Sequence, residues 1–204
     1  AKNYEAHAQF MHEAGHSEIA HAPEDMVIFT KPSTSVIGPD DPIVYPGVPS
    51  AAHLHAFFGN TNTNAYSTPA SLATTGTSTC SGGIMNRSSY WAPVIIDGAG
   101  LPVVPTDAIF YYKSGYYGIA PSDIHPMPAG LRMIAGNGRA TGPQDAHYWG
   151  CFENYIGHFP EIPDGLLCGV GNHVQLQIDF PQCWNGVDLD STDHKSHMAF
   201  PVNG

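Results

Sequence analysis

Two histidines separated by one residue, in the segment His53-Leu54-His55, are the first candidates for chemistry in this sequence. On a β-strand, residues i and i+2 point to the same face, so both imidazoles would lie on one side and Leu54 on the other. That arrangement presents two ligands to one metal ion or two groups for proton transfer. The alternative is that both rings bond to loop carbonyls and are structural.

A second histidine pair lies towards the carboxyl end of the chain, in the segment from Asp190 to His197. Asp193, His194 and His197 place a carboxylate and two imidazoles within five positions. Spaced i and i+3, His194 and His197 would share one face of a helical turn. A carboxylate beside a histidine can fix its tautomer and raise its basicity. The alternative is a polar surface turn.

Together, the two segments predict one polar pocket, provided that folding brings them into contact. Several histidines with a neighbouring aspartate are typical of a divalent metal site, with zinc, calcium or copper as candidates. The predicted ligands are His53, His55, His194 and His197, with Asp193 orienting a histidine. The same residues equally suit a metal-free acid–base site, and the sequence leaves both open.

A third pattern, His12-Glu13-Ala14-Gly15-His16, formally matches the H-E-x-x-H motif of zinc proteases. Gly15 weakens a helix at this place. The extended motif needs Gly and His where this chain has Ile19 and Ala22. A solvated, histidine-rich helix is therefore favoured over a protease centre.

Ligand contacts are predicted from aromatic rings and polar loops. Flat apolar ring faces suit sugar rings, although such rings more often belong to a core. The predicted substrate-binding residues are Asn60, Tyr90, Trp91, Tyr111, Tyr112 and Trp184. Arg132 and Lys113 are predicted to steady a developing negative charge in catalysis. For Arg132 the alternative, pairing with a buried acid, is favoured somewhat.

Charge restricts the class of ligand. The net charge is −11, with seven Lys and Arg residues, whereas nucleic-acid binding requires phosphate-neutralising cations. No run of about 18 apolar residues is present, so no membrane insertion is expected. A neutral or cationic ligand fits this composition, and a polysaccharide or cell-wall glycan is the expected partner.

Cysteine content indicates the compartment. The chain has four cysteines and no CxxC pair. An even count in a loop-rich acidic chain predicts two disulfides and a secreted, extracellular protein. Three pairings are open, and Cys151 with Cys168 is favoured because this pair closes a single loop.

The elements that must position these residues are short strands. With 22 glycines and 18 prolines, the chain is poorly suited to long helices. We expect a mainly β fold, a single β-sandwich or jelly-roll-like domain with long ordered loops over residues 26–204. A His-rich segment with one short helix precedes it over residues 1–25. The expected strands are Met26–Phe29, Tyr90–Ile96, Ala108–Tyr112, Leu131–Ile134 and His173–Phe180, with a hairpin after Ile96 and a long ordered loop over Asn60–Ser81.

Several longer motifs resemble the DUF1996 family, a domain of unknown function in secreted fungal and bacterial proteins. The matching strings are Asp41-Pro42-Ile43-Val44-Tyr45-Pro46-Gly47, residues 53–60, Phe180-Pro181-Gln182-Cys183-Trp184-Asn185-Gly186 and residues 193–199. The resemblance implies secretion, one domain, and both histidine segments as family motifs. It implies no particular activity.

Three functions remain open. The favoured one is a secreted carbohydrate-active enzyme, a hydrolase or lyase, that acts on a wall polysaccharide through the histidine site. The second is a non-catalytic glycan- or wall-binding module with structural histidines. The third is an oxidative copper enzyme, which is disfavoured because a histidine brace requires an N-terminal His and residue 1 is Ala1.

Overall fold

The computed structural model describes residues 25–30, 36–37, 55–64, 66–113, 120–138, 140–152, 156–163 and 168–202. The chain divides into two compact units, Ala1–Ala129 and Gly130–Gly204. The predicted N-terminal helix and His53 lie outside the described residues. No helix in the described part is long and apolar enough to cross a membrane.

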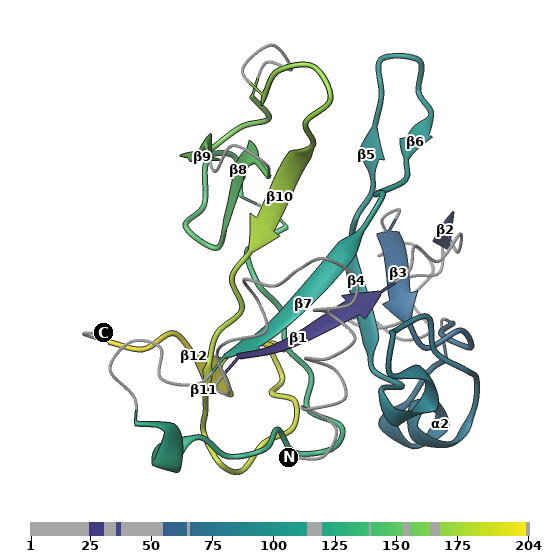
Figure 1. The fold of residues 1–204 in the computed structure, drawn as a ribbon. Coiled ribbons are helices and arrows are strands. Elements are labelled where there is room, and N and C mark those ends of the chain that lie inside the picture. Colours follow the sequence, from purple (N-terminus) through teal and green to yellow (C-terminus); the bar gives the residue numbers. More distant parts are fainter. Residues whose placement is uncertain are drawn as a thin grey trace. The chain divides into compact units, whose positions relative to one another are not determined.

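The first unit contains three small antiparallel sheets (Figure 1). β1 (Asp25–Thr30) pairs with β7 (Ala108–Lys113), and β5 (Ile95–Ile96) pairs with β6 (Pro102–Val103). β3 (His55–Gly59) lies between β2 (Val36–Ile37) and β4 (Ser89–Pro93). A 3₁₀ turn, η2 (Gly83–Met85), precedes β4, and another, η4 (Pro121–Asp123), follows β7.

The central strand β3 carries the apolar core of this unit. All five of its residues are buried, and Phe57 and Phe58 are 2% and 4% exposed. A strand that is buried on both faces does not alternate apolar and polar residues, which explains the apolar run Ala56-Phe57-Phe58. Phe58 lies 6.2 Å from Phe110 of β7, between ring centres. Burying one such ring contributes about 1.5–3 kcal/mol.

Side chains hold the long segment that follows β3, as predicted. The Asn60 amide donates to the carbonyls of Leu72 and Thr75, and its oxygen accepts from the Asn62 N–H. The segment also contains a short helix, α2 (Pro69–Thr74), which begins with a capping box between Thr68 and Ser71.

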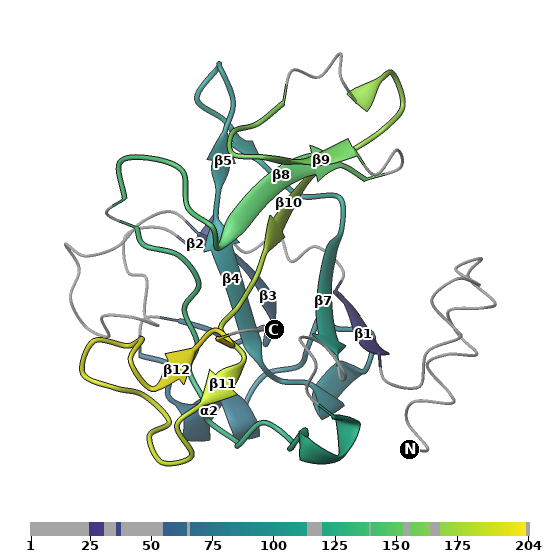
Figure 2. The ribbon, with the colours of Figure 1, turned by 90° about the vertical axis from the view of Figure 1, so that its left-hand side faces the viewer.

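The second unit contains a three-stranded and a two-stranded sheet (Figure 2). β8 (His147–Cys151) lies between β9 (Ile156–Phe159) and β10 (Val174–Ile178), and β11 (Cys183–Trp184) pairs with β12 (Met198–Ala199). The Cys151–Cys168 disulfide fastens the end of β8 to the segment between β9 and β10.

The mainly β class is confirmed, whereas a sandwich is not: the described strands form five small antiparallel sheets. The predicted strands around residues 26–29, 108–112 and 173–180 are confirmed. The run 90–96 divides at Val94 into β4 and β5, and the hairpin after Ile96 is present.

Two expectations are wrong. Residues 131–134 form no strand, because the N–H and C=O of Arg132 are bonded to Leu189 and His197 instead of to a neighbouring strand. The Cys151–Cys168 pairing is confirmed, but Cys80 and Cys183 are free, Cys80 buried and Cys183 exposed. The second predicted disulfide is therefore not formed.

Candidate functional site

The loop of residues 185–197, here called the C-terminal loop, is closed at its base by β11 and β12. Trp184 pairs with Met198, and the Asn185 N–H donates to the His197 carbonyl at 3.0 Å. The strand pair holds the two ends of the C-terminal loop close together. The paired strands therefore position the polar side chains of the loop.

The first part of this loop is tied to its own base. The Trp184 indole N–H donates to the Asp188 carbonyl at 2.6 Å. The Asn185 amide oxygen accepts from the N–H groups of Val187 and Asp188 at 3.0 Å, and its nitrogen donates to the Asp188 carboxylate. Asparagine commonly makes such turns, because its side-chain oxygen accepts from the backbone N–H two residues further on, as a backbone carbonyl does in a β-turn.

Arg132 connects the C-terminal loop to the start of the second unit through three groups. Its N–H donates to the Leu189 carbonyl at 3.0 Å, and its carbonyl accepts from Nε2 of His197 at 2.7 Å. Its guanidinium Nη1 lies 3.1 Å from Oδ2 of Asp190. A further contact, from Lys195 Nζ to the Gly136 carbonyl at 2.8 Å, fastens the loop to the same segment.

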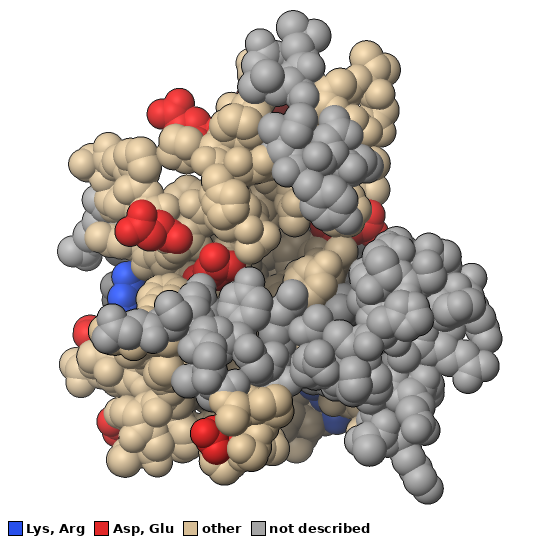
Figure 3. Space-filling model, turned by 60° about the vertical axis from the view of Figure 1, so that its left-hand side comes forward, with Lys and Arg blue, Asp and Glu red and all other residues tan. Residues whose placement is uncertain are grey.

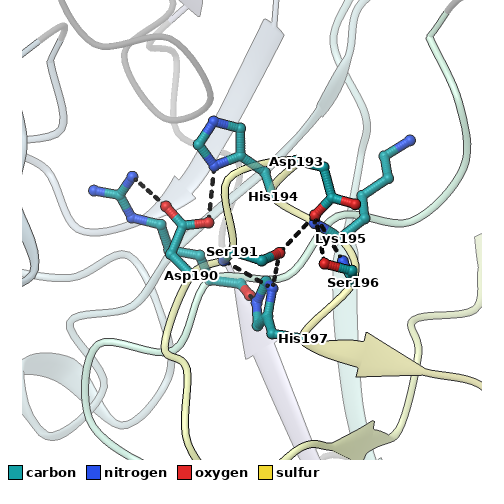
Figure 4. A network of polar contacts seen from close by, with 8 residues as sticks. Asp190, Ser191, Asp193, His194, Lys195, Ser196 and His197 are labelled. Carbon is teal, nitrogen blue, oxygen red and sulfur yellow. Dashed lines mark hydrogen bonds and ion pairs between the residues drawn. The ribbon is translucent and has the colours of Figure 1, made fainter.

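Asp190 and His194 form a carboxylate–imidazole pair (Figure 4). Nδ1 of His194 lies 2.8 Å from Oδ1 of Asp190, and the two side chains are 23% and 25% exposed. An ionised carboxylate can only accept, so Nδ1 donates and a neutral ring keeps its lone pair on Nε2. His194 has φ +58°, in the left-handed region that non-glycine residues rarely adopt. The loop thus holds His194 in an uncommon backbone conformation that orients the ring towards Asp190.

His197 is enclosed and fixed in one tautomer. Its side chain is 1% exposed. Nε2 faces the carbonyl oxygen of Arg132, which can only accept, and Nδ1 faces the N–H of Ser191 at 3.2 Å, which can only donate. The ring is therefore neutral with its hydrogen on Nε2 and its lone pair on Nδ1. Oγ of Ser191 lies 2.8 Å from the same Nδ1.

Asp193 organises the turn between these two pairs. Its Oδ1 accepts from the N–H and hydroxyl of Ser196 at 2.9 Å, from Oγ of Ser191 at 2.7 Å and from the N–H of Lys195 at 3.1 Å. These bonds favour the ionised form and hold the pKa of the exposed carboxyl well below its usual range, the Ser196 N–H contributing most.

Polar side chains of the loop surround an open depression of about 530 Å³. Three carboxylates and three hydroxyl groups line it, from Asp188, Asp190, Ser191, Thr192, Asp193 and Ser196. On the face drawn in Figure 3, the described surface is mostly uncharged, with isolated acidic and basic side chains.

Two expectations for this segment are corrected. His194 and His197 share no helical face, because residues 192–197 form turns and His194 is left-handed. Asp193 bonds directly to neither histidine ring; Asp190 orients His194, and Asp193 reaches His197 through the hydroxyl of Ser191.

In the first unit, His55 lies in an aromatic core. The residue is 5% exposed, with its ring edge against Trp91 at 4.7 Å between ring centres. Tyr90 stacks on Phe110 at 3.8 Å, and the Tyr90 and Tyr112 hydroxyls are 2.8 Å apart. Burial and the Tyr90 contact raise the pKa of Tyr112 far above the usual value.

The other predicted binding residues differ in exposure. Asn60 is 4% exposed and its amide is used within the loop that follows β3. Tyr111 and Trp184 are the more exposed rings, at 47% and 36%. The side chain of Lys113 lies outside the described residues.

His197 does not fit a metal centre in this conformation, because both its ring nitrogens have protein partners. The Asp190 contact at Nδ1 of His194 is compatible with a metal ligand, since metal-ligating histidines commonly make it. No group of three or more metal-ligating side chains occurs among the described residues. His55 belongs to the first unit and His194 to the second, so a shared pocket remains a prediction.

Asp190 and Ser191 complete the site, and the sequence reasoning did not select either as a site residue. Asp190 lies four positions before His194, a spacing compatible with a direct pair in a compact turn. Ser191 carries no local signal, because its role depends on where His197 folds back against it.

Comparisons with known proteins identify the family. The family model described as a domain of unknown function, DUF1996, matches residues 41–204. No curated protein and no solved structure matches the chain. The matched region contains every strand from β3 to β12, both units' candidate residues and the whole C-terminal loop. The chain therefore belongs to the DUF1996 family.

Proposed function

We propose that this chain is a secreted carbohydrate-active enzyme that hydrolyses a wall polysaccharide, with His194 as the general base. The observation that carries this proposal is the Arg132–Asp190–His194 chain, in which Asp190 contacts the guanidinium at 3.1 Å and the imidazole at 2.8 Å. A histidine whose Nδ1–H is held by a carboxylate carries its lone pair on Nε2, the nitrogen that takes the proton in many hydrolases.

The partial burial of the pair suits this role. At about a quarter exposure, the His194 ring is reachable from solvent, while the protein still fixes its tautomer. Asp190 is itself held by Arg132, so the carboxylate keeps its orientation towards the imidazole. A base of this kind contributes about 10²–10⁴-fold to a reaction rate.

Hydrolysis is favoured over elimination by the charges around the depression. A lyase that acts on uronates needs a cation to neutralise the sugar carboxylate. The described lining includes three aspartates and no Lys or Arg. The guanidinium of Arg132 contacts Asp190, and Lys195 bonds to Gly136. A neutral glycan therefore fits better than a polyuronate.

The lining groups also suit a sugar. Carboxylates and hydroxyls bond to sugar hydroxyls, and Trp184, 36% exposed and bonded to Asp188, offers a ring face at the base of the C-terminal loop. The Cys151–Cys168 disulfide supports secretion, because such bonds persist in oxidising compartments.

The test is cleavage of a panel of neutral wall glycans, with and without added zinc, calcium or copper. We expect metal-independent release of reducing ends, and a loss of at least about 100-fold in His194→Gln. His158→Gln is the matched control, because His158 also has a positive φ, +73°, and lies in the same unit. Absence of cleavage across the panel would contradict the proposal.

A second candidate function is a non-catalytic glycan-binding module. The observation that favours it is the exposed Trp184 ring, held on a loop whose polar groups bond extensively to one another. Such a fixed platform binds with little loss of entropy. Binding to insoluble glycan that is lost in Trp184→Ala and unchanged in His194→Gln, without cleavage, would support this function.

A further inference from the structure

A second histidine pair in the C-terminal loop has a different chemistry from the Asp190–His194 pair. Oγ of Ser191 lies 2.8 Å from Nδ1 of His197 (Figure 4). Nε2 of the same ring lies 2.7 Å from the Arg132 carbonyl. A hydroxyl beside a base that a third group orients is the arrangement of an activated nucleophile.

The fixed tautomer of His197 makes it the base of this arrangement. Because Nε2 donates to the Arg132 carbonyl, the ring's lone pair is on Nδ1, the atom that faces Ser191. The ring is 1% exposed, so its position is fixed by the protein around it. Ser191 itself is half-buried and lines the open depression, where a substrate can reach its hydroxyl.

The hydroxyl of Ser191 has two acceptors for its one hydrogen. Oδ1 of Asp193, at 2.7 Å, is one, and Nδ1 of His197 is the other. At rest the hydrogen can bond to the carboxylate while the Ser191 N–H bonds to Nδ1. On attack it passes to the imidazole, because an imidazole is the stronger base.

We propose that Ser191 is the nucleophile of an acyl-transfer site, with His197 as its base, and that its substrates are carboxylic esters such as O-acyl groups on sugar hydroxyls. Oγ bonds to the acyl carbon as its hydrogen passes to Nδ1. The ester C–O bond then breaks, and the departing alkoxy oxygen takes that hydrogen. Water attacks the acyl-serine in the same way, which releases the carboxylic acid and restores the serine.

One backbone donor is suitably placed in sequence for the developing oxyanion. In serine hydrolases the N–H of the residue after the nucleophile often stabilises this charge. Here that residue is Thr192, which lines the depression, and its N–H has no acceptor within the described part of the chain. This activity is independent of glycan hydrolysis, because neither Asp190 nor His194 takes part in the acyl transfer.

The test is covalent labelling of the folded full chain with a fluorophosphonate, followed by peptide mass spectrometry. We expect an adduct on Ser191, none in Ser191→Ala, and labelling at least about 100-fold slower in His197→Gln. Ser122→Ala is the matched control, because the exposed Ser122 hydroxyl also bonds to an aspartate, Asp123, and is not part of the C-terminal loop or of the depression. This variant should label at the unmodified rate.

A second measurement keeps the test decisive if His197→Gln does not fold. In the unmodified chain, labelling should slow on acidification, because a protonated imidazole cannot accept the hydrogen. Asp193 and Arg132 are the charged residues that bond to the Ser191–His197 pair. No adduct on Ser191, or equal labelling of the urea-unfolded chain, would overturn the proposal. Either result leaves glycan hydrolysis by His194 unaffected.

Discussion

Nε2 of His197 donates to the carbonyl of Arg132 at 2.7 Å, across 65 positions of sequence. The two residues belong to segments that form no strand pairing with each other, so this bond and two others of Arg132 join the C-terminal loop to residues 130–137. The stability of the candidate site therefore depends on a buried imidazole.

Replacing His197 by Phe should destabilise the second unit. The Arg132 carbonyl and the Ser191 N–H would both lose their partner beside a buried ring, at a cost of about 2–4 kcal/mol. Urea denaturation measures this change. His125→Phe is the control, since His125 is exposed, and should change the free energy of unfolding by less than about 0.5 kcal/mol. Equal effects of the two substitutions would contradict the account.

Asp193 should stabilise the fold at neutral pH and lose this effect in acid. Its folded-state pKa lies below the unfolded value of about 3.9, so the stabilisation is present above about pH 4 and is lost as the pH falls through the folded-state pKa. Asp193→Asn should therefore unfold at a lower temperature than the unmodified chain at pH 7, with the difference closing towards pH 2. Thermal unfolding at several pH values tests this, and a constant difference would contradict it.

The four cysteines should react in a fixed order. Cys183 is exposed and should react with iodoacetamide in the native protein. Cys80 is 4% exposed, and burial raises the pKa of its thiol, so it should react only on unfolding. Cys151 and Cys168 should react only after reduction, which should cost roughly 3 kcal/mol of stability. Non-reducing peptide mapping that finds Cys80 joined to Cys183 would contradict this order.

Local patterns in the sequence predict part of this structure well. Val174, Leu176 and Ile178 alternate with glutamines, and they form β10. Cys151 and Cys168 are the sequential pair that closes one loop, and they are bonded. Composition alone predicts the mainly β class, because glycine and proline restrict helices.

The parts that could not be predicted depend on contacts between distant residues. Arg132 lies in an apolar run that resembles a strand. Its backbone N–H and C=O, however, bond to Leu189 and His197 of the C-terminal loop and not to a neighbouring strand. His194 adopts a positive φ, which only a small share of histidines do, so the spacing of His194 and His197 could not predict it. Its spacing in the sequence suggested that Asp193 bonds to a histidine ring. In the folded turn His194 bonds to Asp190 instead, and Asp193 accepts from serine side chains and backbone N–H groups.

The most direct test of the central claim, that Asp190 orients His194 as a general base, is the rate of glycan hydrolysis by Asp190→Asn. The amide keeps the size of the side chain and an acceptor for Arg132, but removes the charge that holds the Nδ1–H tautomer. We predict a hydrolysis rate at least about 100-fold lower, whereas the Kd for the glycan changes far less and the protein remains folded at the assay temperature. Hydrolysis at the rate of the unmodified chain would contradict the claim.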